Sequence, residues 1–276
     1  MREGRIPSKV PVEAFFAGGL FLLTGILGVA YGARTWFPPL ASRHGAGIDA
    51  MLLYLLVAVG ALFLCGHVAL GLLIWRGARQ PQVTHRLATA KTEWALSAAL
   101  GLLMALVAEG GVLAIGIPVW SEYFGAAPPR DALLIEVTAQ QFAWNVRYPG
   151  EDGVFGRTET RLIDDVSNPI GIDPDDPAGV DDVTLINQIA VPVNRPVTVR
   201  LRSKDVIHSF FLPHLRVKQD AVPGMTPEMV FVPTRAGTFE IACAELCGLA
   251  HYRMQGVLHV LSEDEFRAWL QEHGSR

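Results

Sequence analysis

The chain has 276 residues, of which half are hydrophobic and only 18% carry a charged side chain. Its net charge of -4 and pI of about 6.1 lack the basic excess of a nucleic-acid-binding protein, so we expect no nucleic-acid partner. Long apolar runs dominate the first 119 residues, and the rest resembles a soluble domain. We therefore expect a membrane anchor over residues 1–125 and a folded domain over residues 130–276.

Three segments are long and apolar enough to cross a lipid bilayer, which requires about 20 residues. They are Ala14–Ala33, Met51–Trp75 and Trp94–Val119. Basic residues precede the first segment and fill the loop between the second and third: Arg2, Arg5, Lys9, Arg76, Arg79, Arg86 and Lys91. Because basic loops remain cytoplasmic, we expect the N-terminus inside and everything after Val119 outside.

The first apolar segment has an alternative reading as a cleaved signal peptide. Its apolar stretch exceeds the usual signal core of about 7–15 residues, which favours a retained helix. Two polar residues lie inside the other segments. Glu109 suits either a functional role or a hydrogen bond between packed helices, and His67 suits helix packing.

Beyond residue 130 the hydrophobic pattern changes to alternation with period two. Several short strands with turn signals predict an all-β sandwich, followed by a terminal helix that begins at Ser262 with Glu265 in a capping box. Seven aspartates crowd into Asp164–Asp182, with no Lys or Arg among them. This insertion is either a solvated loop or a surface that attracts a basic partner.

Cys243 and Cys247 lie in the segment CAELCGLAHYRM, together with His251 and Met254. Cysteines four apart in an extended loop rarely approach closely enough for a disulfide. Structural zinc would take no methionine, and a catalytic thiol would leave the second cysteine without a role. Two thiols, an imidazole and a thioether suit copper, so we favour a copper site over the disulfide.

Two cysteines suggest two metals that share bridging sulfurs, and such a centre needs a second imidazole. His208 follows strand residues about 35 positions before Cys243. It is placed as a ligand from a neighbouring strand should be. His214, six residues further on, is expected to be a surface or supporting residue.

The segments DVIHSFFLP, LRVKQDAVPGM and CAELCGLAHYRM resemble the copper-binding domain of cytochrome c oxidase subunit II, over roughly Ala132 to Leu261. The resemblance implies a membrane-anchored, cupredoxin-like sandwich with a dinuclear copper centre. By it, Cys243 and Cys247 bridge the metals, and His208 and His251 each ligate one. The remaining ligands would be Met254 and the backbone carbonyl of Glu245, whose side chain would meet magnesium at the subunit I interface.

The resemblance also implies the function. The chain would accept electrons from cytochrome c and pass them to the haems of subunit I for reduction of oxygen to water, coupled to proton translocation. It would lie in the inner (plasma) membrane with other oxidase subunits, and it would not be catalytic alone. The alternative is the copper-containing subunit of a nitric oxide reductase. A quinol oxidase subunit would lack the copper ligands, and a copper-delivery protein would have a more open site.

Three features depart from the family pattern. The family usually has two membrane helices, whereas three are expected here. Phe142 occupies the place where a tryptophan often receives the electrons, and Trp144 is a second candidate for that role or for the core. Glu93, at the start of the last apolar segment, is either a proton-uptake residue or a simple carboxylate at a helix N-terminus.

Overall fold

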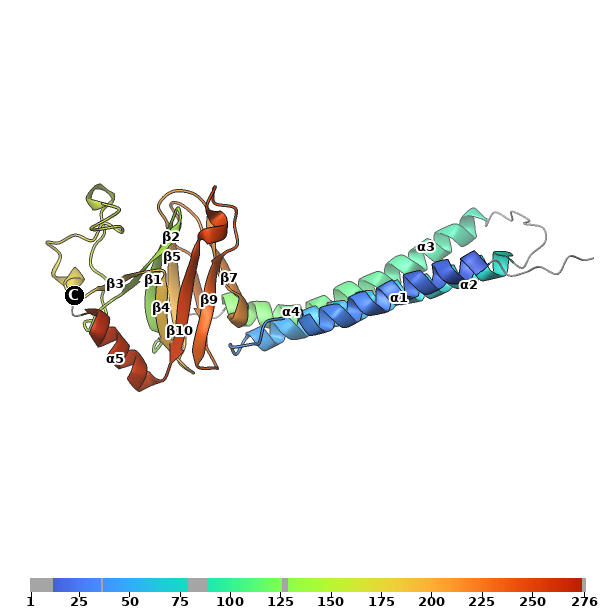
Figure 1. The fold of residues 1–276 in the computed structure, drawn as a ribbon, viewed down its shortest axis with the longest axis horizontal. Coiled ribbons are helices and arrows are strands. Elements are labelled where there is room, and N and C mark those ends of the chain that lie inside the picture. Colours follow the sequence, from blue (N-terminus) through green and yellow to red (C-terminus); the bar gives the residue numbers. More distant parts are fainter. Residues whose placement is uncertain (1–11, 36, 79–88, 126–128, 275–276) are drawn as a thin grey trace, which may run out of the picture. The chain divides into compact units, whose positions relative to one another are not determined.

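The computed structural model describes residues 12–35, 37–78, 89–125 and 129–274. The chain divides into two compact units, one comprising Met1–Phe37 and Asp49–Pro118 and the other Pro38–Ile48 and Val119–Arg276 (Figure 1). Of the basic residues used to orient the apolar segments, Arg2, Arg5, Lys9, Arg79 and Arg86 lie outside the described residues.

Long apolar helices make up the N-terminal part of the chain. The elements are α1 (Val12–Thr35), α2 (Gly45–Ala78), α3 (Ala90–Met104), a π-helical turn η1 (Ala105–Glu109), α4 (Gly110–Trp120) and a second π-helical turn η2 (Ser121–Gly125). Three helical stretches meet the length and hydropathy needed to cross a membrane: Phe15–Gly32, Gly45–Gly77 and Ala90–Phe124. Each overlaps one of the expected apolar segments, so the expectation of three long apolar helices is confirmed.

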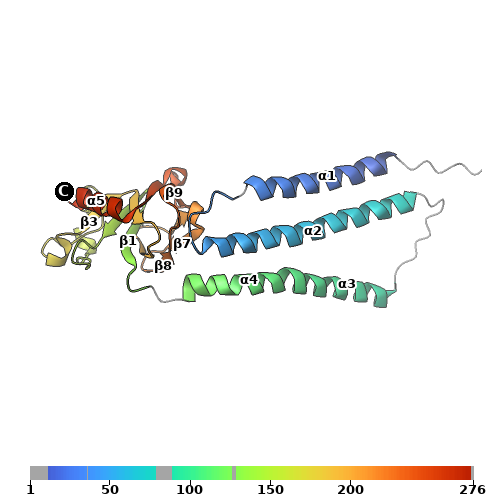
Figure 2. The ribbon, with the colours of Figure 1, turned by 90° about the horizontal axis from the view of Figure 1, so that it is seen from below.

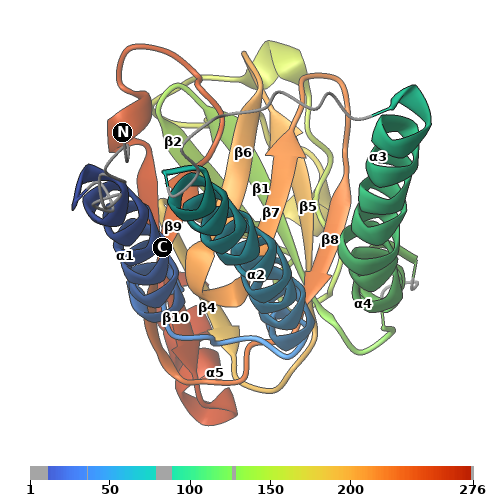
Figure 3. The same ribbon diagram turned by 90° about the vertical axis from the view of Figure 1, so that its right-hand side faces the viewer.

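Within the helical unit, α2 lies between α1 and the α3–α4 helix (Figures 2 and 3). His67 on α2 takes part in this packing. Its ring centroid lies 4.0 Å from that of Phe63 and 5.5 Å from that of Phe21 on α1, and its Nδ1 lies 2.8 Å from the carbonyl oxygen of Phe63. Glu109 ends η1 and is exposed among the described residues.

The second unit is a β-sandwich. The first sheet has the order β3-β2-β1-β5-β8 and contains β1 (Leu133–Gln140), β2 (Ala143–Tyr148), β3 (Val183–Ile186), β5 (Val197–Ser203) and β8 (Glu228–Phe231). The second has the order β4-β10-β9-β6-β7 and contains β4 (Gln188–Pro192), β6 (His208–Leu212), β7 (Val217–Ala221), β9 (Gly237–Cys243) and β10 (Gln255–Leu261). The buried core includes Val137, Trp144, Val199, Phe210 and Ile241.

The helix α5 (Glu263–Gly274) contacts β3 and β4, the edge strands on one side of the two sheets. Covering those edges protects unpaired backbone groups from association with other chains. Its expected capping box is present. The Ser262 hydroxyl accepts a hydrogen bond from the Glu265 backbone N–H, and the Glu265 carboxylate accepts one from the Ser262 backbone N–H at 2.9 Å.

The connection between β2 and β3 contains the short 3-10 turns η3 (Thr160–Leu162) and η4 (Pro177–Gly179), and the aspartate-rich insertion Asp164–Asp182 forms its last part. Ion pairs connect it to its surroundings: Asp173 with Arg157, Asp182 with the buried Arg147, and Asp165 with Lys204. Basic residues outside the insertion therefore neutralise part of the negative charge that the sequence places in it.

The segment Pro38–Ile48 packs on the sandwich by backbone pairing. The Ala41 backbone N–H donates to the carbonyl of His214 at 2.8 Å, and the Arg43 N–H donates to that of Val232 at 3.0 Å. The Arg216 guanidinium donates to the Pro38 carbonyl at 2.6 Å. The connection between the first two apolar helices is thus part of the folded domain.

Candidate metal centre

The predicted metal ligands meet at one end of the second sheet because neighbouring strands begin and end there. His208 is the first residue of β6, and Cys243 is the last residue of the antiparallel β9. The loop after Cys243 contains Cys247 and the short turn η6 (His251–Arg253), and it returns to the sheet through Met254, the residue before β10. The rigid sheet thus fixes both ends of the ligand loop.

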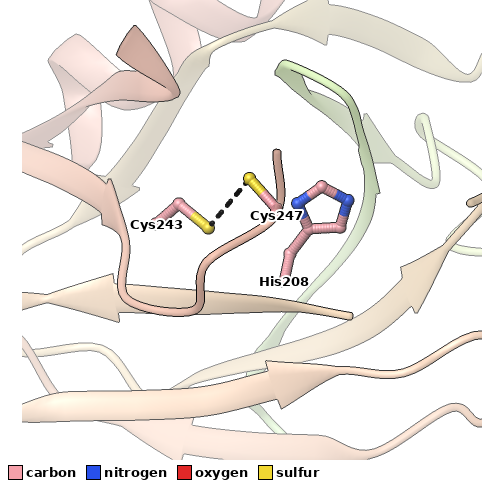
Figure 4. Close-up of side chains that lie close together, drawn as sticks. All are labelled: His208, Cys243 and Cys247. Atoms are coloured by element: carbon pink, nitrogen blue, oxygen red, sulfur yellow. Dashed lines mark hydrogen bonds between the residues drawn. The ribbon is translucent and has the colours of Figure 1, made fainter. Parts of the chain in front are cut away.

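Three potential ligand atoms, one each from His208, Cys243 and Cys247, all lie within 4.8 Å of one another. Figure 4 shows the two thiols facing each other with the imidazole beside Cys247. The Cys247 sulfur lies 3.8 Å from the Cys243 sulfur, 3.6 Å from Nδ1 of His251 and 3.7 Å from the Met254 sulfur. The sulfur–sulfur distance is well beyond the roughly 2 Å of a disulfide.

The backbone carbonyl of Glu245 completes the donor set. It accepts a hydrogen bond from the Cys243 thiol at 3.2 Å, while the Glu245 side chain is exposed. The structure therefore brings together all six residues predicted as copper ligands. His208, Cys247 and Met254 are buried, and Cys243 and His251 are half-buried.

His208 is arranged as a metal-binding histidine is expected to be. Its Nε2 lies 2.8 Å from a carboxylate oxygen of Asp205, and its buried Nδ1 has no hydrogen-bond partner among the described residues. If Nε2 carries the proton shared with Asp205, Nδ1 presents a free lone pair. A buried, unpaired nitrogen beside two thiols fits a metal ion.

The environment of Cys247 has a consequence for metal binding. Burial, together with the neighbouring Cys243 sulfur, raises the pKa of the Cys247 thiol to about 11. Both cysteines are free thiols in the structure. A metal that binds as a thiolate complex must therefore displace protons when it enters this site.

The other candidate residues lie in different surroundings. Phe142 is half-buried beside the ligand loop, and Trp144 is fully buried with its ring edge-to-face against His208, at a centroid distance of 6.2 Å. His214 follows the far end of β6. Glu93 lies in the first turn of α3, in the helical unit, where the helix dipole favours a carboxylate.

Two residues beside the cluster were not identified from the sequence. Asp205 contacts His208, and Gln141, in the turn between β1 and β2, donates its side-chain amide to the Cys247 carbonyl at 2.6 Å. The position of Asp205, three residues before His208, is a signal that sequence reasoning could have used. Gln141 comes from the opposite sheet and has no comparable signal.

Comparison with known proteins places this arrangement in a family. Residues 133–261 match the family described as cytochrome c oxidase subunit II, periplasmic domain. The alternative cytochrome c oxidase subunit 2 of Bradyrhizobium diazoefficiens is 36% identical over 240 residues, covering 86% of this chain and 83% of the relative. This chain belongs to the cytochrome c oxidase subunit II family. The cytochrome c oxidase subunit 2 of Cereibacter sphaeroides is 29% identical over 90% of this chain and 82% of its own length.

Among solved structures, the periplasmic domain of subunit II of the Bradyrhizobium japonicum cytochrome oxidase shares 31% identity. The match covers 54% of the present chain and 98% of the solved structure, with a TM-score of 0.40. The family membership confirms the expected fold class, long apolar helices followed by a cupredoxin sandwich, and the expected identity as an oxidase subunit II. It favours the oxidase over the nitric oxide reductase alternative. The clustered His, Cys and Met side chains are consistent with a copper site in such a subunit.

Proposed function

We propose that this subunit II accepts electrons from cytochrome c at a dinuclear copper centre and passes them to the haems of subunit I, where oxygen is reduced to water with proton translocation. The observation that carries the proposal is the convergence of two thiols, two imidazoles and a thioether at one rigid end of the sandwich. These soft donors suit copper, and two cysteines allow two metals to share bridging sulfurs.

The protein residues have separable tasks in this proposal. Cys243 and Cys247 would hold the copper as thiolates, with His208 and His251 as imidazole ligands. Met254 and the Glu245 carbonyl would supply the remaining donor atoms. When bound, the copper centre supplies reversible one-electron chemistry. Burial of His208, Cys247 and Met254 excludes water, and attachment to two strands limits movement of the ligands when the oxidation state changes.

The exposed side chain of Glu245 leaves room for its second proposed role, as a ligand to magnesium at the interface with subunit I. We propose that the chain is inactive alone, because the haem is carried only by that partner. The copper domain would lie on the periplasmic side of the inner membrane, with the apolar helices in the bilayer. Glu93 is proposed to take up protons near subunit I on the cytoplasmic side.

For the point where electrons enter, we propose Phe142 or Trp144, and their exposure favours Phe142. The Trp144 side chain has no exposed surface, whereas Phe142 is half-buried beside the backbone of the ligand loop. A donor protein can approach only the exposed surface. Trp144 is better placed to pack against His208 from within the core of the sandwich.

The proposal is tested by purifying the full chain in detergent, adding copper and recording EPR and visible spectra. We expect a purple protein whose hyperfine pattern shows one unpaired electron shared by two copper nuclei. Cys243→Ser and Cys247→Ser should each abolish that pattern, whereas Cys65→Ser on α2 should preserve it. A blue protein with the spectrum of a single copper nucleus, or no copper binding, would refute the dinuclear centre.

A further inference from the structure

The turn that joins β1 to β2 is hydrogen-bonded directly to the ligand loop, although the turn and the loop connect strands of opposite sheets. The side-chain amide of Gln141 donates a hydrogen bond to the backbone carbonyl of Cys247 at 2.6 Å. The backbone N–H of the same residue donates to a carboxylate oxygen of Asp205 at 2.7 Å. One residue of the turn therefore connects to both sides of the ligand cluster.

Gln141 and Phe142 lie close to the peptide that accepts the hydrogen bond, Cys247–Gly248. Gly248 follows Cys247 with φ +136°, and a Cβ atom there would lie only 2.7 Å from Nε2 of Gln141 and 3.2 Å from the Phe142 ring. Real Cβ atoms do not approach a nitrogen so closely. The absence of a side chain at position 248 lets the amide of Gln141 reach the backbone of the loop.

Asp205 extends the connection to the second ligand strand. One of its oxygens lies 2.8 Å from Nε2 of His208, and the other accepts the Gln141 backbone N–H. Residues that support metal ligands in this way fix the orientation of the ligand and tune the metal. The β1–β2 turn is thereby coupled to His208 through Asp205 and to Cys247 through the side chain of Gln141.

We propose that Gln141 is a positioning residue for the metal centre: its side-chain amide holds the Cys247–Gly248 peptide so that the Cys247 sulfur stays in place before and after the metal binds. The proposal rests on the proposed function only in naming copper as the metal. Without this hydrogen bond the loop has greater freedom, so it exchanges its amide hydrogens and releases its metal more readily.

The test uses the full chain in detergent and three variants. Gln141→Ala removes the side chain, and Gln141→Glu keeps its shape but, as a carboxylate, has no N–H to donate. Gln140→Ala is the matched control, because the Gln140 side chain accepts hydrogen bonds from Asn145 and Lys204 instead of contacting the ligand loop. Thermal unfolding of each variant shows whether overall stability has changed.

In the copper-free chain, we expect amide hydrogen exchange across residues 248–251 to be faster in both Gln141 variants, on the order of 3- to 10-fold, and unchanged in Gln140→Ala. In the copper-loaded chain, transfer of copper to a chelator should accelerate by a similar factor, with an altered EPR hyperfine splitting. Loop exchange and copper release equal to those of Gln140→Ala would overturn the proposal. So would changes that simply follow the thermal stability of each variant.

The two proposals fail differently. Faster loop exchange in the copper-free Gln141 variants, in a chain that forms no dinuclear copper centre, would refute the proposed function and leave the role of Gln141 intact. A normal dinuclear copper spectrum, with amide hydrogen exchange in the Gln141 variants equal to that of the unaltered chain, would support the proposed function and refute the role of Gln141.

Discussion

Position 248 requires glycine for two separate reasons. Its φ of +136° lies where side chains are strained, and an added Cβ would meet Gln141 and Phe142. Gly224 provides a comparison, because it has φ +79° with open space around it. The two positions therefore differ both in the degree of backbone strain and in the space available for a side chain.

We expect Gly224→Ala to lower the free energy of unfolding of the sandwich by about 1 kcal/mol, through strain alone. Gly248→Ala should lower it by about 3 kcal/mol, because overpacking adds to the strain. Denaturant unfolding of the full chain, followed by near-ultraviolet circular dichroism, measures both. Equal losses would mean that neither the larger φ nor the crowding by Gln141 and Phe142 adds a cost at position 248.

Arg147 forms a buried ionic contact in the sandwich. Its guanidinium Nε donates to Asp182 at 3.0 Å and its Nη1 lies 3.6 Å from Glu136, with all three side chains almost fully buried. Arg147→Ala would remove the cation that pairs with Asp182, whereas Glu136 would keep its second ion pair, with Arg202 at 3.3 Å. We expect a loss of about 3–5 kcal/mol in the free energy of unfolding.

The control for that variant is Arg200→Ala. Arg200 pairs with Glu228 at 2.8 Å, but both side chains are about two-fifths exposed. Such a surface pair contributes only about 0–1 kcal/mol, because water competes for both charges. If the two variants lost the same stability, burial would not be what makes Arg147 important.

The clustering of the candidate metal ligands was predictable from sequence because four of the side chains lie within one loop. Cys243, Cys247, His251 and Met254 converge through local geometry, and their chemistry limits the choice of metal. Gln141 was not predictable, because its contact with Cys247 joins residues 106 positions apart, on opposite sheets. No sequence pattern around a glutamine in a turn predicts a hydrogen bond to so distant a residue.

Among the elements, the segment Pro38–Ile48 carries a buried histidine. His44 is only 7% exposed, and its burial lowers its pKa from 6.5 to about 4, against the opposing effect of a hydrogen bond to the Leu215 carbonyl. Its ring packs beside that of Tyr123, and Glu122 and Arg43 line the same small cavity. The histidine is therefore neutral in the folded protein at neutral pH.

Acid should weaken the attachment of this segment. Because the unfolded chain protonates His44 more readily than the folded chain, stability present above pH 6.5 is lost as the pH falls toward about 4, by up to about 3 kcal/mol. The acid-unfolding curve of the full chain should show this loss, and His44→Gln should flatten it between those values. A negative charge on Glu122 would reduce the loss of stability, because it favours the protonated imidazole. If His44→Gln gave the same acid-unfolding curve as the unaltered chain, the prediction would be wrong.

The strands illustrate what a linear pattern reveals and what it omits. Alternating hydrophobicity predicts the existence of β-strands, because one face of each must be buried. It does not predict that β1 pairs in parallel with β5, or that β10 pairs in parallel with β4. Those pairings are set by the packing of two whole sheets.

At the scale of the whole molecule, the connection between β2 and β3, which includes the aspartate-rich insertion, extends along the sandwich. It leaves β2 at the end opposite the ligand cluster, about 20 Å away for a strand of six residues, and it reaches back to Lys204, next to Asp205. Asp165 thus lies toward the metal-binding end and Glu151 toward the other. Both side chains are exposed.

A basic electron donor that docks near the metal should therefore respond to Asp165 and not to Glu151. We expect Asp165→Asn to slow the second-order reaction of the assembled oxidase with cytochrome c about 2- to 3-fold at low ionic strength, and the difference should vanish at high salt as screening increases. Glu151→Gln is the matched control. Stopped-flow measurements over a range of salt concentrations distinguish them, and equal effects would argue against docking at this end.

The position of β10 has a consequence for biosynthesis. This strand is the last in the chain, yet it lies inside its sheet, between β4 and β9, and it holds one end of the ligand loop. A growing polypeptide must therefore emerge almost completely before the sheet can close. The proposed copper would therefore enter only after β10 has joined the sheet and closed the ligand loop.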